Sequence, residues 1–569
     1  MKRISPRWLF APTIVLLAQG QTRASDLILT NGHIYTARAT APFVEALSVT
    51  GGRIEAVGDD QEIRRAAGHA TVIDLHGRTV IPGIVDSHVH TLFGAYALHG
   101  LNLSTPEESI TPDQSEQLLA RLRAYAAAHP ADKVLFARAD FATVAPLAPT
   151  HELLDRAVAD RPVIVHNTSE HALWLNAKAL ELAHLMDEPV ADPDMERGII
   201  RDASGHPQGV LLEAAMALAN RAANAVVPTE DKLAWLREAM RLQNSYGITS
   251  IVNASGDLDE IRLYATLRDR GQLTVRTRTS FGEVAVPHHL TPKFLADLEQ
   301  ARRLYHDDWV AANLVKFFLD GSTGLLPPLV YRPAEYRALV LELDRRGFQL
   351  MSHALRDDSV RLILDAYEAA QSANGARERH LRIEHAQLIQ DSDVARFARL
   401  NVVADMQPAF CCSDVGTNFD AVHPLVSDRW HSLSESGGHL AFSSDWPCTW
   451  PPDPFVGMQQ AVTRRVWRSA ATAGIPGGAV DGAGQGGAVP TQTVYEPQER
   501  VSVQTAVDAY TRGGAYAAAR EDLIGTLEPG KAADLIVLSQ DIFQAPPEEI
   551  SKTRVAVTMV GGRVVLGAW

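Results

Sequence analysis

Cysteine is scarce in this chain of 569 residues, which contains only Cys411, Cys412 and Cys448. Such a small, odd number does not build a disulfide scaffold, and adjacent cysteines rarely bridge each other. A bond from Cys411 or Cys412 to Cys448 remains an open alternative. No Cys-x-x-Cys pair occurs, which argues against a metal site built from thiolates.

Basic residues are fewer than acidic ones, and long apolar runs are absent from the sequence. The 53 lysines and arginines face 68 acidic residues, which gives a formal net charge of −15. Without a long basic run to neutralise phosphates, no nucleic-acid partner is expected. No apolar run reaches the roughly 20 residues that a helix needs to cross a bilayer.

The first 24 residues have the form of a secretory signal peptide. A basic start is followed by an apolar stretch over residues 9–18, and Thr22 and Ala24 occupy the −3 and −1 positions of a cleavage site. We therefore expect a signal peptide at 1–24 and a secreted or periplasmic mature protein with no membrane contact. An uncleaved N-terminal anchor is the alternative.

Short alternating strands joined by glycine turns fill both ends of the chain. DLILTNGHIYT and ALSVTGGRIEAVG lie near the start, and KAADLIVLS and VAVTMVGGRVVLG near the end. This texture is typical of antiparallel sheet, and chain termini are often close in space. We expect residues 25–82 and 525–569 to form one composite β-sandwich domain.

Between residues 83 and 524, apolar strand-like runs alternate with amphipathic helical stretches. Continuous apolar strands are typical of parallel sheets covered by helices, and at this length a (β/α)8 barrel of the TIM type is the economical choice. A doubly wound open sheet is the alternative, but no Gly-x-Gly-x-x-Gly turn follows its first strand. Residues 101–228 are too long for one loop and predict an inserted subdomain. The glycine-rich residues 470–493 predict a mobile loop.

Polar side chains stand where several apolar runs end. In a parallel barrel these ends meet at one face, and residues two apart on a strand point the same way. Each histidine alone is more simply a core residue, but a buried cluster is costly unless a cation compensates it. We expect a divalent ion, most simply Zn²⁺, with iron, manganese and cobalt as alternatives. The residues concerned are His88, His90, Lys316, His353, His385 and Asp445.

The motifs IPGIVDSHVH, VKFFLDGSTG, SHAL, RIEHAQ, FSSDWP and IGTLEPGKAADLIVL together resemble the amidohydrolase superfamily. The resemblance is closest to its family 3, the group similar to N-substituted formamide deformylases, and covers nearly the whole mature chain. It implies a metal-dependent hydrolase that cleaves a non-peptide C–N bond, in an amide, N-formyl or N-acyl compound, with metal-activated water. It also implies one or two ions bound by the cluster above, a carbamate on Lys316 as in some relatives, and a homodimer.

Further residues receive roles in this interpretation. Asp445 is placed to carry the proton of the attacking water, and His171 either donates to the substrate carbonyl or is structural. Arg356 stands where the family usually has glycine, which points to a substrate contact. Trp446 either walls an apolar pocket or packs, and Arg382 is expected to pair with a carboxylate rather than bind substrate.

Two other functions remain open from the sequence alone. A barrel does not fix its chemistry, so a lyase or isomerase is one alternative to a hydrolase acting on a small molecule. A non-catalytic periplasmic binding protein is the other, although a binding site has no need of Asp445 as a proton carrier. His439 is expected at the far end of the barrel, and Phe281 and Phe318 in the core.

Overall fold

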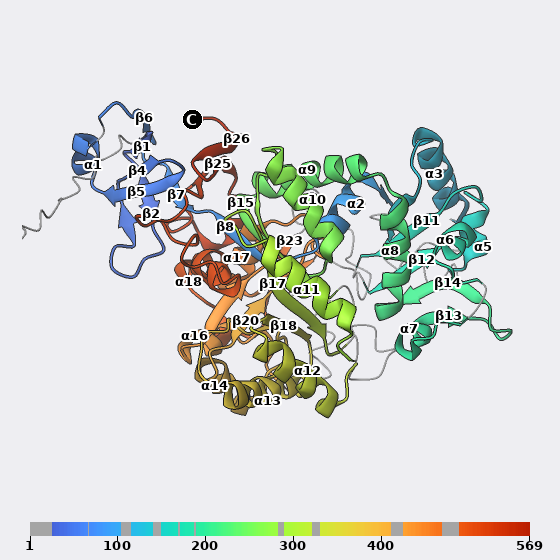
Figure 1. Ribbon diagram of the computed structural model, residues 1–569. Helices are drawn as coiled ribbons and strands as arrows, with labels where there is room; N and C mark the ends of the chain where they lie inside the picture. Colours follow the sequence, from blue (N-terminus) through green and yellow to red (C-terminus); the bar gives the residue numbers. More distant parts are fainter. Residues whose placement is uncertain are drawn as a thin grey trace, which may run out of the picture.

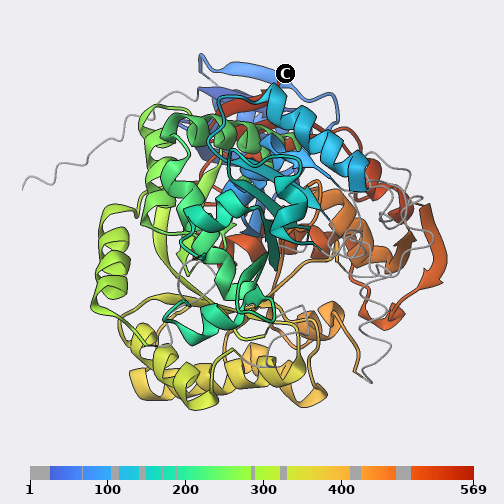
Figure 2. The same cartoon turned by 90° about the vertical axis from the view of Figure 1, so that its right-hand side faces the viewer.

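The structure is a computed structural model that describes residues 26–66, 68–103, 115–139, 149–168, 171–186, 189–282, 289–320, 330–410, 425–468 and 489–569. The predicted signal peptide, Cys411, Cys412 and most of the predicted glycine-rich loop lie outside these residues. Figure 1 shows a β-sandwich on the left, a barrel in the middle and an insert on the right. From the insert's side, the insert lies in front of the barrel (Figure 2).

The central body is an eight-stranded parallel sheet. Its strands, in spatial order, are β8 (Ile84–Val89), β15 (Ile248–Asn253), β16 (Arg276–Phe281), β17 (Val310–Phe318), β18 (Gln349–Ala354), β19 (Arg382–His385), β20 (Val403–Met406) and β21 (His439–Phe442). The segment after β21 closes the sheet onto β8, because the Asp445 N–H donates to the His88 carbonyl at 2.8 Å and the His90 N–H to the Trp446 carbonyl at 2.7 Å. The predicted TIM-type barrel is confirmed.

Helices cover the outside of this sheet, which is why its strands are apolar on both faces. The helices that follow the insert are α10 (Leu258–Asp269), α11 (Pro292–Leu304), α12 (Pro333–Arg345), α13 (Asp357–Asn374), α14 (Asp391–Arg399), α16 (Trp430–Glu435), α17 (Pro454–Thr463), α18 (Val503–Asp508) and α19 (Gly514–Ala517). Local signals set their starts: Asp257 caps α10 by accepting from the N–H groups of Asp259 and Glu260, as aspartate does at helix N-termini.

The two chain ends meet in one β-sandwich. One sheet has the order β5-β4-β1-β6 and the other β26-β25-β24-β7-β2-β3. Strand β24 pairs antiparallel with β7, which joins the end of the chain to its start. Leu29 and Leu47 of the first sheet pack with Ile34, Val80 and Val537 of the second in one core. The elements are β1 (Leu27–Thr30), β2 (His33–Tyr35), β3 (Phe43–Val44), β4 (Ala46–Thr50), β5 (Arg53–Gly58), α1 (Asp60–Ala66), β6 (Thr71–Asp74), β7 (Thr79–Pro82), β24 (Leu535–Leu538), β25 (Val555–Val560) and β26 (Arg563–Gly567).

The insert leaves the barrel through α2 (Thr91–His99) and returns through α9 (Thr229–Ser245). It has its own six-stranded sheet, with the order β13-β14-β12-β11-β10-β9, and its own core around Leu118, Leu122 and Trp174. The apolar runs KVLFARA and PVIVHN, which read like the barrel strands, belong to this sheet as β10 and β11. Its elements are β9 (Leu101–Asn102), α3 (Ser115–Ala128), β10 (Leu135–Ala139), α5 (His151–Asp155), β11 (Val163–Asn167), β12 (Ala172–Leu175), α6 (Ala177–Leu182), α7 (Pro193–Arg197), β13 (Ile199–Arg201), β14 (Pro207–Leu212) and α8 (Met216–Val226).

One predicted boundary is wrong. The loop prediction ran to residue 493, but Val489–Val494 forms strand β23, which pairs antiparallel with β22 (Arg465–Arg468). Backbone hydrogen bonds between β22 and β23 join two segments that are separated along the chain. The glycine-rich composition of the residues before β23 does not indicate this pairing.

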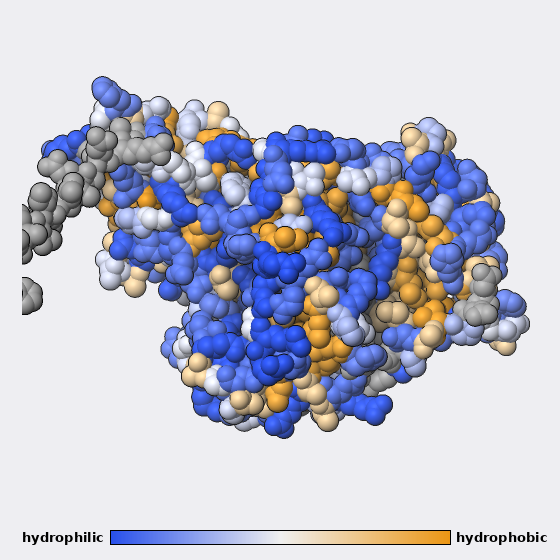
Figure 3. Space-filling view, viewed as in Figure 1, coloured by the Kyte–Doolittle hydropathy of each residue, from blue (hydrophilic) through white to orange (hydrophobic). Residues whose placement is uncertain are grey.

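Hydrophilic residues cover most of the face in Figure 3, and hydrophobic ones show in bands over the insert and the lower part of the barrel. Within the part of the chain that the structure describes, no helix has both the length and the apolarity to cross a membrane.

Candidate metal centre

The predicted ligands gather at the carboxyl ends of the barrel strands. His88, Lys316, His353 and His385 end or nearly end β8, β17, β18 and β19. His90 follows β8 directly, and Asp445 lies in the segment that closes the barrel after β21. All are buried except His90, whose side chain is 11% exposed. The tertiary structure therefore brings together residues from four strands and from the segment that follows β21.

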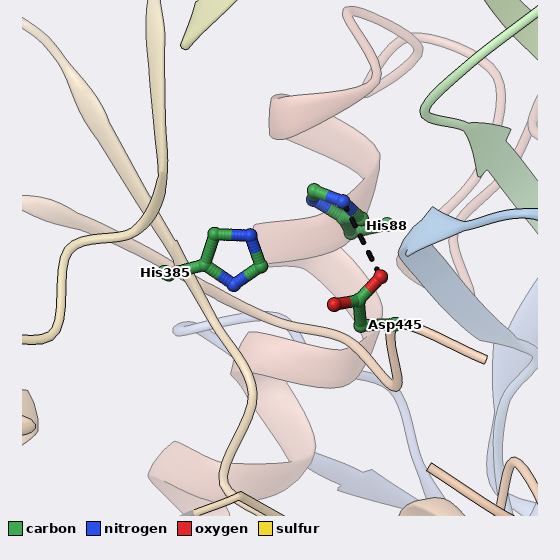
Figure 4. Close-up of side chains that lie close together, drawn as sticks. All are labelled: His88, His385 and Asp445. Atoms are coloured by element: carbon green, nitrogen blue, oxygen red, sulfur yellow. Dashed lines mark ion pairs between the residues drawn. The ribbon is translucent and has the colours of Figure 1, made fainter. Parts of the chain in front are cut away.

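One donor atom from each of His88, His385 and Asp445 lies within 4.8 Å of the other two (Figure 4). Asp445 Oδ1 is 3.5 Å from His88 Nε2 and 3.2 Å from His90 Nε2. The His353 ring centre is 4.4 Å from that of His385, and Lys316 Nζ is 3.3 Å from His88 Nε2. These distances are compatible with side chains that share an ion.

Three residues that the sequence did not single out hold the imidazoles by their Nδ1 atoms. Glu384 Oε2 lies 2.5 Å from His88 Nδ1. Ser255 Oγ and Gln407 Oε1 each lie 2.6 Å from the Nδ1 of His90 and His385, respectively. Partners on the second ring nitrogen fix the orientation of metal-binding histidines. The arrangement aims the Nε2 atoms of His88 and His90 at the Asp445 carboxylate.

Two buried polar atoms in the cluster have no hydrogen-bond partner: Asp445 Oδ1 and His353 Nε2. His353 Nε2 is 3.3 Å from Asp320 Oδ1, but without hydrogen-bond geometry. Orphaned buried acceptors and donors are rare because each costs free energy. Nitrogen and carboxylate oxygen form the donor set that Zn²⁺ and similar ions accept. The residues present therefore fit a divalent cation.

Burial also places these groups in the protonation states that bind a cation. It lowers the pKa of His385 to about 4 and the pKa values of His88 and His353 well below the ordinary 6.5. Burial lowers the pKa of Lys316 to about 8, although Glu384 and Asp445 oppose the shift. For Asp445, burial raises the pKa, but His90, His385 and Lys316 outweigh it, and the pKa falls below its usual value. Neutral imidazoles thus face an ionised carboxylate.

The backbone is strained at two of the candidate ligands. His385 has φ 67° and Asp445 φ 54°, and Ala386, next to His385, has φ 46°. Left-handed backbone is uncommon for residues other than glycine, and such strain concentrates at functional sites. The packing of the barrel mouth maintains these conformations.

Lys316 and Phe318 differ from the simplest expectations. Asp320 is the nearest acidic residue to Lys316 along the chain, but its carboxylate accepts from the N–H groups of Leu355 and Arg356. Lys316 Nζ lies instead 4.4 Å from the ring centre of Phe318, whose ring stacks on His353. Phe318 is only half-buried and adjoins the cluster, so the prediction that it lies in the core was wrong.

Arg382 and His439 lie in the predicted places. Arg382 is fully buried and donates to Glu384 at 2.7 Å and to Asp405 at 2.8 Å, so its pairing with carboxylates is confirmed. His439 begins β21, at the opposite end from Asp445, and stacks on Tyr516. Phe281 is buried, as predicted.

The insert contributes His171 to the barrel mouth. Its ring centre is 5.9 Å from that of His353, and its Nδ1 is 2.8 Å from Glu213 Oε2. Glu213 follows β14 and adopts φ 48°. The sequence did not single out Glu213, because 42 positions separate it from His171 along the chain and no local pattern indicates their contact.

The two predicted substrate contacts have other partners in this structure. The Arg356 guanidinium donates twice to Asp358, at 3.0 and 2.6 Å. The Trp446 indole is fully buried and packs so tightly on Gly94 of α2 that a Cβ there would lie 2.0 Å from it. Of the two alternatives for Trp446, the structure therefore shows packing, and its assignment to the substrate pocket is corrected.

Asp86 fastens the Asp445 segment to β8. Its carboxylate accepts from the Ser444 N–H at 2.8 Å and from Ser444 Oγ at 2.5 Å. Burial raises the pKa of Asp86 from 3.8 to about 7, although the Ser444 hydrogen bonds oppose the shift.

A dependence of stability on pH follows from Asp86. Between about pH 4 and pH 7 the unfolded chain has released a proton that the folded chain keeps, so the free energy of unfolding falls as the pH rises. In the Asp86→Asn variant this position does not titrate, so it contributes no pH dependence. In chelator-treated protein, the stability of the variant relative to the unmodified chain should therefore increase between pH 5 and 8, by roughly 2–4 kcal/mol.

Thermal unfolding at a series of pH values measures this effect. Asp257→Asn is the matched control, because Asp257 also accepts backbone N–H groups but is only half-buried. A pH-independent difference between Asp86→Asn and the unmodified chain would contradict the prediction.

Comparisons with known proteins agree with this geometry. The model of the amidohydrolase family matches residues 71–566. N-substituted formamide deformylase of Arthrobacter pascens is 27% identical over 569 residues, which cover 95% of this chain and 98% of that protein. Protein LONG AFTER FAR-RED 3 of Arabidopsis thaliana is also 27% identical, over 95% of this chain and 91% of that protein.

A solved structure extends the similarity to three dimensions. The crystal structure of an uncharacterized metal-dependent hydrolase from Pyrococcus furiosus is 25% identical, with a TM-score of 0.67 over 91% of this chain and 100% of that chain. The family match spans most of the chain and includes every residue of the buried cluster. The protein therefore belongs to the amidohydrolase family, whose members include metal-dependent hydrolases.

Proposed function

We propose that this chain is an exported, zinc-dependent hydrolase that cleaves the C–N bond of an N-formyl or N-acyl amine. The observation that carries the proposal is the Asp445 carboxylate at the barrel mouth: its Oδ1 has no hydrogen-bond partner and lies 3.2 and 3.5 Å from the Nε2 atoms of His90 and His88. Similarity to N-substituted formamide deformylase over nearly the full length of both chains supports this substrate class. The signal-like residues 1–24 support export.

His88, His90, His353, His385 and Asp445 would hold the ion, with Lys316 beside them. When bound, a divalent cation polarises a substrate carbonyl and lowers the pKa of water at the site. Asp445 would accept the proton of the attacking water and deliver it to the leaving nitrogen, since its depressed pKa keeps it ionised beforehand. It would lie close to both reacting groups, because it is itself one of the residues that would hold the ion.

His171 would bind the substrate carbonyl oxygen from the insert side. Glu213 Oε2 lies 2.8 Å from His171 Nδ1 and orients the imidazole, which would stabilise the negative charge that develops on the substrate oxygen. We expect His171→Ala to lower kcat by about 10²-fold, as loss of an oxyanion donor does. Steady-state kinetics would measure it, and Glu213→Gln should give a smaller loss. An unchanged kcat in His171→Ala would contradict the role as a donor to the substrate and would favour the alternative that His171 is structural.

Lys316 is suited to carboxylation, because burial lowers its pKa to about 8 and the reaction requires the neutral amine. If its carbamate bridges two ions, Lys316→Ala should lower the metal content of the barrel site from two ions per chain toward one. Elemental analysis of purified protein measures the content. Lys293→Ala is the control, since Lys293 is exposed on α11. An unchanged stoichiometry in Lys316→Ala would mean that the lysine bridges nothing.

The proposed activity is tested with a panel of N-formyl and N-acyl amines, with and without chelator. Release of the amine that stops on chelation and returns with Zn²⁺ supports the proposal. Binding without turnover would favour a non-catalytic binding protein, and elimination or rearrangement products would favour a lyase or isomerase. Sequencing the N-terminus of protein from the extracytoplasmic fraction tests export, with Ser25 expected first.

A further inference from the structure

A second group of potential ligands lies outside the barrel mouth. His99, His129 and Asp132 each place one donor atom within 4.8 Å of the other two. His99 Nε2 is 2.9 Å from Asp132 Oδ2, and His129 Nδ1 is 3.4 Å from the same oxygen. We refer to these three residues as the hinge cluster.

The hinge cluster lies at the base of the insert, where the chain leaves and re-enters the barrel. His99 is the last residue of α2, the exit helix, whereas His129 and Asp132 follow α3 of the insert. Trp235 of the return helix α9 stacks on His99 with a ring-centre distance of 4.2 Å. The end of the exit helix, the return helix and a turn within the insert thus meet at these side chains.

Neighbouring residues hold the hinge cluster in place. Arg161 donates to the carbonyl of His129 at 2.6 Å and to that of Asp132 at 3.3 Å, which fixes the turn after α3. The Tyr125 hydroxyl donates to the His99 carbonyl at 3.0 Å, and the Tyr125 ring packs on His129. The side chains of His99, His129 and Asp132 are 20%, 32% and 17% exposed, so an ion can reach them from solvent.

We propose that the hinge cluster binds a divalent transition-metal ion, Zn²⁺ in the first instance, separately from the barrel site. Two imidazole nitrogens and one carboxylate oxygen are three of the four ligands of a tetrahedral zinc site, and water supplies the fourth at a partly exposed position. The role is structural: the ion tethers α2 to the segment after α3. It thereby fixes the insert that carries His171 over the barrel mouth.

The test measures bound zinc per chain after equilibration with micromolar Zn²⁺ and gel filtration. We expect Asp132→Asn and His129→Gln each to bind one ion fewer than the unmodified chain, and to lose a zinc-dependent rise in apparent melting temperature. His206→Gln is the matched control, because His206 and Asp202 are an exposed pair in the same insert without a second histidine. A barrel variant, His88→Ala with His385→Ala and Asp445→Ala, removes the three barrel residues whose donor atoms lie within 4.8 Å of one another and should keep one ion.

The outcomes separate the two sites. Equal zinc in the unmodified chain and in both hinge variants would overturn the proposal, as would a barrel variant without zinc. If Asp132→Asn fails to fold, as judged by circular dichroism, His129→Gln decides. A hinge variant without zinc, together with a barrel variant that keeps one ion, would uphold the hinge site and refute the metal centre on which the proposed function depends.

Discussion

Replacing Asp445 by asparagine is expected to keep most of the metal while turnover falls by about 10²–10⁴-fold, the usual contribution of a positioned proton carrier. The amide retains an oxygen at the Asp445 Oδ1 position, 3.2 Å from His90 Nε2, but cannot accept the water's proton. The values of kcat and kcat/KM should decrease by the same factor, which is the sign of an interaction made in the transition state.

Paired kinetics and elemental analysis would check this result. Asp453→Asn is the matched control: Asp453 is eight residues further along, but its carboxylate caps α17 through the Phe455 N–H. Asparagine caps helices nearly as well as aspartate, so this control should keep its activity. An Asp445→Asn enzyme with a near-normal rate would rule out the proton-carrier role.

Arg382→Met is expected to lower the free energy of unfolding by about 3–5 kcal/mol, because it leaves buried carboxylates without their cation. Arg382, Glu384 and Asp405 are all fully buried. Arg382 also donates to the Ser87 carbonyl at 2.7 Å. Because Glu384 holds His88 Nδ1, weaker metal binding should accompany the lost stability.

Denaturant unfolding of the chelator-treated protein measures the stability change, and zinc titration the loss of affinity. Arg345→Met is the control, since Arg345 pairs with Glu342 on the surface and is 60% exposed. Exposed pairs contribute about 0–1 kcal/mol. If the free energy of unfolding fell by a similar, small amount in both variants, the buried interactions of Arg382 would not be needed for stability.

Much of the candidate site could be predicted from the sequence, because a parallel barrel places the carboxyl ends of its strands next to one another. His88, His353 and His385 each end an apolar run, and a parallel barrel brings those ends to one face. The sequence left the assignment of strands to sheets open where the same local pattern serves two sheets. The runs at β10 and β11 are as apolar as the barrel strands, and only their pairing with each other and with β12 shows where they belong.

The orientation of the imidazole rings and the contacts between distant segments could not be predicted, for a similar reason. The partners on Nδ1, Glu384, Ser255 and Gln407, are ordinary polar residues in sequence, and only the closed barrel brings Glu384 to His88, 296 residues away. The Trp446 indole is buried because α2 presents Gly94 to it, a contact between separate elements. The hinge cluster likewise combines the end of one helix with the turn after another.

The sequence by itself determined the kinds of element and the identity of the candidate ligands, since burial on both faces and polar strand ends are local patterns along the chain. Only the tertiary structure decided which strands share a sheet, which ring nitrogens face the Asp445 carboxylate, and how the insert brings His171 to His353. The physical reason is that these outcomes depend on packing between segments hundreds of residues apart, and no local pattern encodes that packing.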